Sequence, residues 1–198
     1  KNFVLKVCRA RQDWTMEGFI DNAVKKISKI EGNVLCGVSG GIDSTVAALL
    51  IHKAIGNRQK CVFVNNGLLR LNEENEIEEM FKNNFHVNFV SVNAVQVFLD
   101  KLKGVEDPEK KRMVVGEEFI HVFTEFAQKN GPFKWLAQGT LYPDVIESGV
   151  SKGPAAVIKS HHNVGGLPDW LDLEILEPLR DLYKDEVRKI AKILGVPE

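Results

Sequence analysis

The residues best suited to chemistry form one short run, Ser39-Gly40-Gly41-Ile42-Asp43-Ser44, with Thr45 directly after it. Neighbouring glycines let a backbone turn sharply and approach a ligand closely. The hydroxyl groups of the two serines and of Thr45 can donate hydrogen bonds to an anion. A carboxylate such as Asp43 suits a phosphate site only when a cation is present, and Mg²⁺ binds one or two carboxylates together with phosphate oxygens. The run therefore predicts a site for phosphate groups and Mg²⁺.

The segments on either side of the run support this prediction. Residues 34–38 are an apolar stretch typical of a buried parallel strand, and residues 45–55 favour a helix that Gly56 would end. Free N–H groups at the start of such a helix attract an anion. A Walker loop is excluded because no Lys occurs between Ser39 and Thr45, and the dinucleotide pattern G-x-G-x-x-G does not fit residues 37–41. The alternative is an ordinary strand-to-helix turn in which the glycines serve only geometry.

Strand and helix patterns alternate along the chain. Strands are predicted at residues 34–38, 61–64, 87–92, 135–137 and 173–176. Helices are predicted at residues 16–30, 45–55, 72–81, 94–102, 108–128 and 181–194, with Asp13 or Thr15, Asn72 and Asp107 as N-caps. This alternation predicts an α/β fold, a parallel twisted sheet of about five strands with helices on both faces. Ligands bind such sheets at the carboxyl ends of the strands, where the run Ser39–Ser44 lies.

Composition narrows the class of protein. The chain has 198 residues, 44% hydrophobic and 27% charged, and a net charge of -1. This balance fits one globular domain without the basic field that sequence-independent nucleic-acid binding requires. Cys8, Cys36 and Cys61 form no CxxC pair, which favours a reducing, cytoplasmic location. No apolar run approaches the roughly 18 residues of a membrane span, so neither nucleic acid nor membrane is expected as a partner. The chain starts without Met, and we expect it to be a piece of a longer protein.

The run Ser39–Ser44 matches the SGGxDS loop of the N-type ATP pyrophosphatases, also called PP-loop enzymes. Residues 10–14, 66–70, 137–148, 158–168 and 184–188 are in addition similar to the ATP-pyrophosphatase domain of the GMP synthetases. The resemblance covers nearly the whole chain. It implies a Rossmann-like, adenine nucleotide alpha-hydrolase-like fold in which the loop holds the β- and γ-phosphates of ATP while the α-phosphate is attacked.

The resemblance also implies a reaction and its partners. ATP with Mg²⁺ would adenylylate XMP at O2 and release pyrophosphate, and glutamine-derived ammonia would then give GMP, which is ligase chemistry of purine biosynthesis. Residues 1–198 would be the ATP-pyrophosphatase (synthetase) domain, while the glutaminase and the C-terminal dimerisation domain are absent from this chain. A glutaminase domain or subunit and a homodimeric complete enzyme are expected. The alternatives are another PP-loop enzyme, of the NAD synthetase or tRNA thiolase type, and a non-catalytic nucleotide-binding module.

The same resemblance assigns roles to single residues, each with a simpler alternative. It implies that Asp43 binds Mg²⁺, although an Asp there can also cap the next helix. It implies that Lys159 contacts the ATP phosphates and that Arg112 binds the phosphate of XMP, although both can be solvated surface charges. Asp144, with Glu147 nearby, can activate the acceptor or assist metal binding, or Asp144 can cap a helix.

The remaining expectations concern ATP. The loop residues Ser39 to Thr45, together with Gly139 and the backbone at Val64, are implied to bind the nucleotide. His161 and His162 are neighbours on an extended segment and are not expected to share a metal. Residues 149–156 are expected to form a mobile loop that closes over the reaction intermediate. One departure from the family pattern is Asn65, where Asp is common, which predicts weaker nucleotide binding if that charge is used.

Overall fold

The computed structural model of the chain describes residues 2–11, 13–149 and 173–197. The described residues form a five-stranded sheet in the order β3-β2-β1-β4-β5, and every neighbouring pair of strands is parallel. The strands are β1 (Val34–Gly37), β2 (Gln59–Asn65), β3 (Phe89–Asn93), β4 (Trp135–Ala137) and β5 (Glu174–Leu176). The predicted parallel sheet is therefore confirmed.

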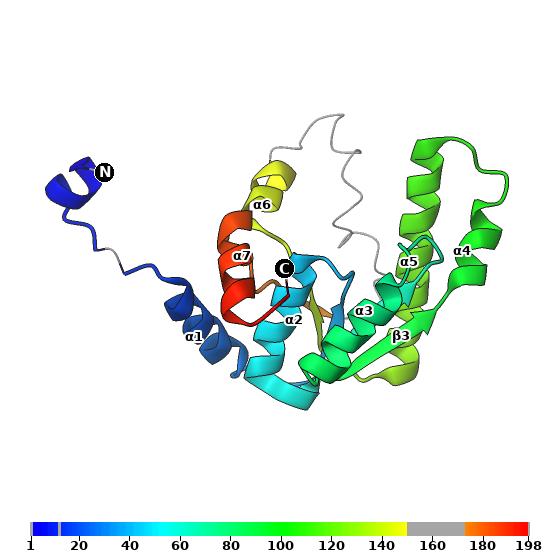
Figure 1. The fold of residues 1–198 in the computed structure, drawn as a ribbon, viewed down its shortest axis with the longest axis horizontal. Coiled ribbons are helices and arrows are strands. Elements are labelled where there is room, and N and C mark those ends of the chain that lie inside the picture. Colours follow the sequence, from blue (N-terminus) through cyan, green and yellow to red (C-terminus); the bar gives the residue numbers. More distant parts are fainter. Residues whose placement is uncertain (1, 12, 150–172, 198) are drawn as a thin grey trace.

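The helices cover both faces of this sheet (Figure 1). They are α1 (Met16–Ile27), α2 (Ile42–Ile55), α3 (Glu73–Glu79), α4 (Val95–Leu102), α5 (Pro108–Asn130), α6 (Tyr142–Gly149) and α7 (Lys184–Ile193). Short helical turns occur at Phe3–Val7, Gly56–Arg58 and Met80–Asn84. The first of these turns extends away from the sheet, beyond α1.

Alternate residues of the strands supply two different cores. Val34, Cys36 and Phe63 point to one face and pack with α2 and α3. Leu35 and Val62 point to the other face and pack with α4 and α5. Successive side chains of a strand point to opposite faces, so a strand in a sheet covered on both sides must be apolar at every position. The sequence of β1 is such a continuous apolar run.

The order of the strands reverses between β1 and β4. The chain runs outward from β1 through β2 to β3, then crosses back to β4 on the other side of β1 and continues to β5. Such a reversal opens a crevice at the carboxyl ends of the two central strands, and ligands of open α/β sheets bind there. The loop that follows β1 lies at this position.

Several predicted helix ends are confirmed. The Thr15 hydroxyl accepts a hydrogen bond from Gly18 N at 3.1 Å, and the Asp107 carboxylate accepts one from Lys110 N at 2.8 Å, so both residues are N-caps. Gly56 ends α2 with a φ of 55°, a left-handed value that glycine adopts easily.

Other boundaries were predicted wrongly. Helix α2 begins at Ile42 rather than at residue 45, so the last residues of the loop are also the first turn of the helix. Helix α7 begins at Lys184 rather than at residue 181, because the Glu186 carboxylate accepts a hydrogen bond from Tyr183 N at 2.9 Å and fixes the start there. Asn72 precedes α3 but makes no side-chain cap. Helix α6 was not predicted as a helix.

Candidate active site

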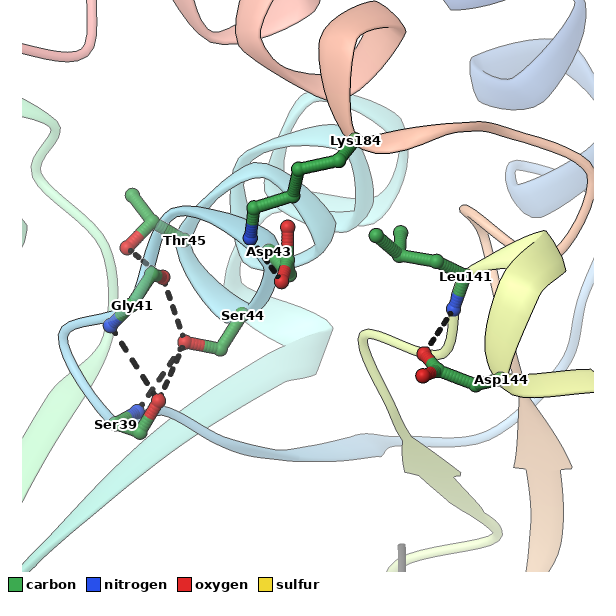
Figure 2. Close-up of polar contacts among 8 residues, drawn as sticks. All are labelled: Ser39, Gly41, Asp43, Ser44, Thr45, Leu141, Asp144 and Lys184. Atoms are coloured by element: carbon green, nitrogen blue, oxygen red, sulfur yellow. Dashed lines mark hydrogen bonds and ion pairs between the residues drawn. The ribbon is translucent and has the colours of Figure 1, made fainter. Parts of the chain in front are cut away.

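The loop between β1 and α2 is held in shape by its own hydroxyl groups (Figure 2). Ser44 Oγ donates to Gly41 O at 2.9 Å and accepts from Ser39 N at 3.2 Å. Ser39 Oγ lies 3.2 Å from Ser44 Oγ and accepts from Gly41 N at 3.4 Å. Thr45 Oγ1 donates to Gly41 O at 3.0 Å. The loop is thus ordered before any ligand arrives, which lowers the cost of binding one.

Two glycines are required by the space around them. Gly40 has a φ of +77°, and a Cβ added to it would lie 2.5 Å from Cδ1 of Ile77 on α3. Gly139, just after β4, faces the loop from the other side, and its added Cβ would lie 3.1 Å from the carbonyl carbon of Asp43. The loop therefore lies between α3 and the segment that follows β4. A side chain at either glycine would require the neighbouring atoms to move.

Asp43 is the carboxylate of the loop. Its Oδ2 lies 2.5 Å from Nζ of Lys184, the first residue of α7 (Figure 2). Its Oδ1 is buried and has no hydrogen-bond partner among the described residues. A buried carboxylate oxygen without a partner is costly, and in native proteins it calls for a role such as binding an ion. Oδ1 is an acceptor ready for a cation or for the donor of a ligand.

A pocket of about 580 Å³ opens at the reversal point of the sheet. One side of it is polar and is formed by the loop and by the residues after β4. The other side is mostly apolar and belongs to α5. The lining residues are Gly37, Val38, Ser39, Asp43, Ser44, Arg112, Val115, Gly116, Phe119, Ile120, Phe123, Leu136, Ala137, Gln138, Gly139 and Thr140. A loop of backbone N–H groups and hydroxyls facing an apolar wall suits a molecule with a phosphate end and a flat, less polar end.

The structure brings together many of the residues that the sequence singled out. This pocket is lined by Ser39, Asp43, Ser44, Gly139 and Arg112. Arg112 lies on α5, far from the loop in the sequence. The guanidinium of Arg112 is paired with the Glu109 carboxylate at 2.6 Å.

Other predicted residues lie around the pocket rather than on its lining. Gly40, Gly41 and Ile42 shape the loop, and Thr45 is buried with its hydroxyl already bonded to the backbone. The side chain of Val64 is buried in the core beneath α4 and α5. These residues can serve a ligand only through the backbone or through the shape of the loop.

Asp144 belongs to the start of α6. Its Oδ2 accepts a hydrogen bond from Leu141 N at 2.9 Å, as a residue that stabilises a helix start does (Figure 2). Asp144 does not line the pocket around Asp43. Lys159, His161, His162 and most of the expected loop 149–156 lie outside the described residues.

The sequence pointed to Lys184 only as part of a matching segment, without a role. Its charge reaches Asp43 across 141 residues of chain, so spacing gives no signal. The apolar residues of α5, including Phe119 and Phe123, belong to the helix predicted at residues 108–128 and pack in the core beside β1 and β2. The structure shows that they also form the wall of the pocket.

Among the described residues, no group of three or more His, Cys, Asp or Glu side chains is arranged to hold a metal ion. Any cation at Asp43 would therefore need oxygen atoms from a ligand, which is the usual arrangement for Mg²⁺ beside phosphates. No helix in the described part of the chain is long and apolar enough to cross a membrane.

Comparisons with known proteins place the chain in a family. A family model described as NAD synthase matches residues 14–116. The chain is 58% identical over its whole length to a GMP synthase (glutamine-hydrolyzing) of Maridesulfovibrio salexigens, and 56% identical to the one of Acetivibrio thermocellus. It spans 39% of the length of each of these relatives.

The fold agrees with this assignment. The NMN synthetase structure from Francisella tularensis superimposes with a TM-score of 0.65 over 93% of this chain and 73% of that one, at 19% sequence identity. The family uses ATP, as the resemblance of the Ser39–Ser44 loop implied. The chain belongs to the NAD synthase family of PP-loop domains.

Proposed function

We propose that this chain is the ATP-pyrophosphatase domain of a glutamine-hydrolysing GMP synthase. The observation that carries the proposal is the pocket at the sheet reversal, which the ordered Ser39–Ser44 loop and Asp43 line on one side and α5 lines on the other. Asp43 Oδ1 has no hydrogen-bond partner among the described residues. The similarity to GMP synthases extends over the whole of this chain, at 58% and 56% identity, and supports this enzyme over other PP-loop enzymes.

In this proposal the loop holds the leaving end of ATP. Backbone N–H groups at the start of α2 would donate to the β- and γ-phosphates, and the Ser39 hydroxyl would add a donor. The Ser44 hydroxyl, which donates to Gly41 O, would hold the loop in shape. Lys184 adds a positive charge next to the loop, 2.5 Å from Asp43. Fixed donors and charges at the place where negative charge develops are the main source of rate acceleration in such reactions. Lys159 is proposed as a second cation on these phosphates.

The residues present fit a magnesium ion. Asp43 would hold it through Oδ1, the buried oxygen without a partner among the described residues. Mg²⁺ bound there would neutralise charge on the departing pyrophosphate. Lys184, already paired with the other oxygen of Asp43, would hold that carboxylate in place.

The acceptor would be XMP. Its O2 attacks the α-phosphorus of ATP, the bond to pyrophosphate breaks, and ammonia then displaces AMP from C2 to give GMP. Arg112, which lines the pocket, is proposed to bind the phosphate of XMP, exchanging its present partner Glu109 for it. The base of ATP would rest on the apolar wall of α5 and on the backbone near Val64, and Asp144 is kept as a candidate for activating the acceptor.

The partners of the complete enzyme are part of the same proposal. A glutaminase domain or subunit would supply the ammonia, since this chain spans 39% of the length of its relatives. A homodimer and a cytoplasmic location are also proposed.

The first test is calorimetric titration of the chain with Mg-ATP, with and without saturating pyrophosphate. We expect binding that pyrophosphate abolishes, because both ligands would use the Ser39–Ser44 loop. A folded chain that binds no Mg-ATP would overturn the proposal. In the complete enzyme, pyrophosphate release should then depend on XMP. Release that depends on another acceptor would favour another PP-loop enzyme, and ATP binding without acceptor-dependent release would favour a nucleotide-binding module.

A further inference from the structure

A second polar cluster lies at the carboxyl ends of β2 and β3, outside the pocket. Its centre is Glu74 on α3, a half-buried residue. Glu74 Oε1 accepts a hydrogen bond from Ser91 Oγ of β3 at 2.6 Å. Its Oε2 accepts a short hydrogen bond from Nδ2 of Asn65, the last residue of β2. One carboxylate therefore ties α3 to the ends of two neighbouring strands.

The other end of the Asn65 side chain is also used. Its Oδ1 accepts a hydrogen bond from Gly67 N at 2.9 Å and so closes the turn that follows β2. A side chain at this position must accept at one end and donate at the other, which an amide does and an ionised carboxylate cannot. Asn65 and Glu74 are thus a chemically matched pair, and this explains why Asn stands where the resemblance led us to expect Asp.

Helix α3 also supports the phosphate loop. Ile77 lies three residues after Glu74, on the same face of the helix, and is 5% exposed. Its Cδ1 is the atom that a Cβ on Gly40 would meet at 2.5 Å. The face of α3 that holds the strand ends through Glu74 is therefore the face on which the loop rests through Ile77.

We propose that Glu74 is a positioning residue of the ATP site, which holds the Asn65 turn and helix α3 where the Ser39–Ser44 loop needs them. Glu74 borders a separate, smaller pocket of about 280 Å³ beside Asn65 and not the pocket around Asp43, so its effect on the phosphate loop passes through Ile77 and Gly40. The inference rests on the proposed function, since its readout is the binding of Mg-ATP.

The test is a swap of the two side chains' chemistry. Asn65→Asp places two carboxylates in contact, and we expect Mg-ATP to bind about tenfold more weakly. Adding Glu74→Gln to that variant restores every hydrogen bond with one reversed: the Gln amide donates to the new Asp and its oxygen still accepts from Ser91. Binding by the double variant should return to within about threefold of the original chain. Glu76→Gln, an exposed carboxylate on the same helix, is the matched control and should change nothing.

Thermal unfolding and calorimetry together separate positioning from general stability. Recovery of ATP affinity by the swap supports the inference, since a merely additive loss of stability gives a double variant weaker than either single one. Two outcomes overturn the inference and leave the proposed function intact. In the first, Asn65→Asp binds Mg-ATP as tightly as the original chain. In the second, the double variant binds Mg-ATP no more tightly than Asn65→Asp alone. A folded original chain that binds no Mg-ATP overturns both. If Asn65→Asp does not fold, Ser91→Ala carries the test, with about threefold weaker binding expected and unchanged binding contradicting it.

Discussion

The two flanks of the Ser39–Ser44 loop are built in opposite ways. On the pocket flank, formed by Gly139, Lys184 and the start of α2, Asp43 keeps a buried oxygen without a partner among the described residues. On the support flank, formed by Asn65, Glu74 and Ile77, the amide and carboxylate atoms are paired with one another, with the backbone at Gly67 or with the Ser91 hydroxyl.

This difference separates binding from positioning. A buried polar atom left without a partner costs about 1–3 kcal/mol, and a ligand or cation that reached Asp43 Oδ1 would recover that cost. A fully paired network instead fixes one conformation and leaves its atoms little capacity to bind a ligand. The pocket flank therefore has the properties of a binding surface, and the support flank those of its foundation. Changes on the pocket flank should lower activity with stability intact, and changes on the support flank should lower both.

The largest effect is expected from Asp43→Asn. The change removes the charge that would hold Mg²⁺ but keeps the shape of the side chain. We expect XMP-dependent pyrophosphate release by the complete enzyme to fall about 10²–10³-fold, with an unchanged unfolding temperature. Asp21→Asn, an exposed carboxylate on α1, is the matched control. Normal pyrophosphate release by the Asp43 variant would show that Asp43 does not hold the metal. The contrast between the two flanks would then lose its main support.

The next effect belongs to the support flank. Gly40→Ala forces a Cβ into a left-handed backbone position and against Ile77. We expect a loss of about 1–3 kcal/mol in the free energy of unfolding, together with weaker Mg-ATP binding. Gly104→Ala is the matched control, because Gly104 has the same φ of +77° but nothing within 4 Å of its added Cβ. Equal losses in chemical denaturation would show that backbone strain accounts for the whole effect and that Ile77 does not support the loop.

A smaller effect is expected from Lys184→Met on the pocket flank. The change removes the partner of Asp43 Oδ2 but keeps an unbranched side chain, and we expect Mg-ATP to bind about three- to tenfold more weakly. The difference should shrink at high salt, because the pair is partly exposed and ions screen it. Lys189→Met, an exposed lysine on the same helix, should leave the calorimetric affinity unchanged. A Lys184 variant that binds as tightly as the original chain would exclude this lysine from the phosphate site.

The sequence predicted the pocket flank better than the support flank. The Ser39–Ser44 loop combines glycines, hydroxyls and a carboxylate in one short run, and the flanking apolar patterns placed it at a strand end. The pairing of Asn65 with Glu74 leaves no such pattern, because each residue type is common on surfaces and only the packing of α3 brings them together. Lys184 was missed as a charge partner for the same reason, since the fold alone joins the start of α7 to the loop.

The smallest effect is expected in the sheet that carries both flanks. Cys36 of β1 and Cys61 of β2 occupy neighbouring positions in the sheet. Both are buried free thiols, whereas Cys8 is an exposed one. Burial, and then the neighbouring Cys36, raises the pKa of the Cys61 thiol well above its ordinary value, so this thiol stays protonated and unreactive at neutral pH. An aromatic disulfide reagent should therefore label Cys8 alone in the native chain, and all of the cysteines after unfolding. Saturating Mg-ATP should leave this pattern unchanged, because ligand binding is confined to the loop and its pocket flank. Labelling of Cys61 in the native chain, or its appearance on adding Mg-ATP, would mean that the strands open with the site and that the two flanks do not stand on a rigid base.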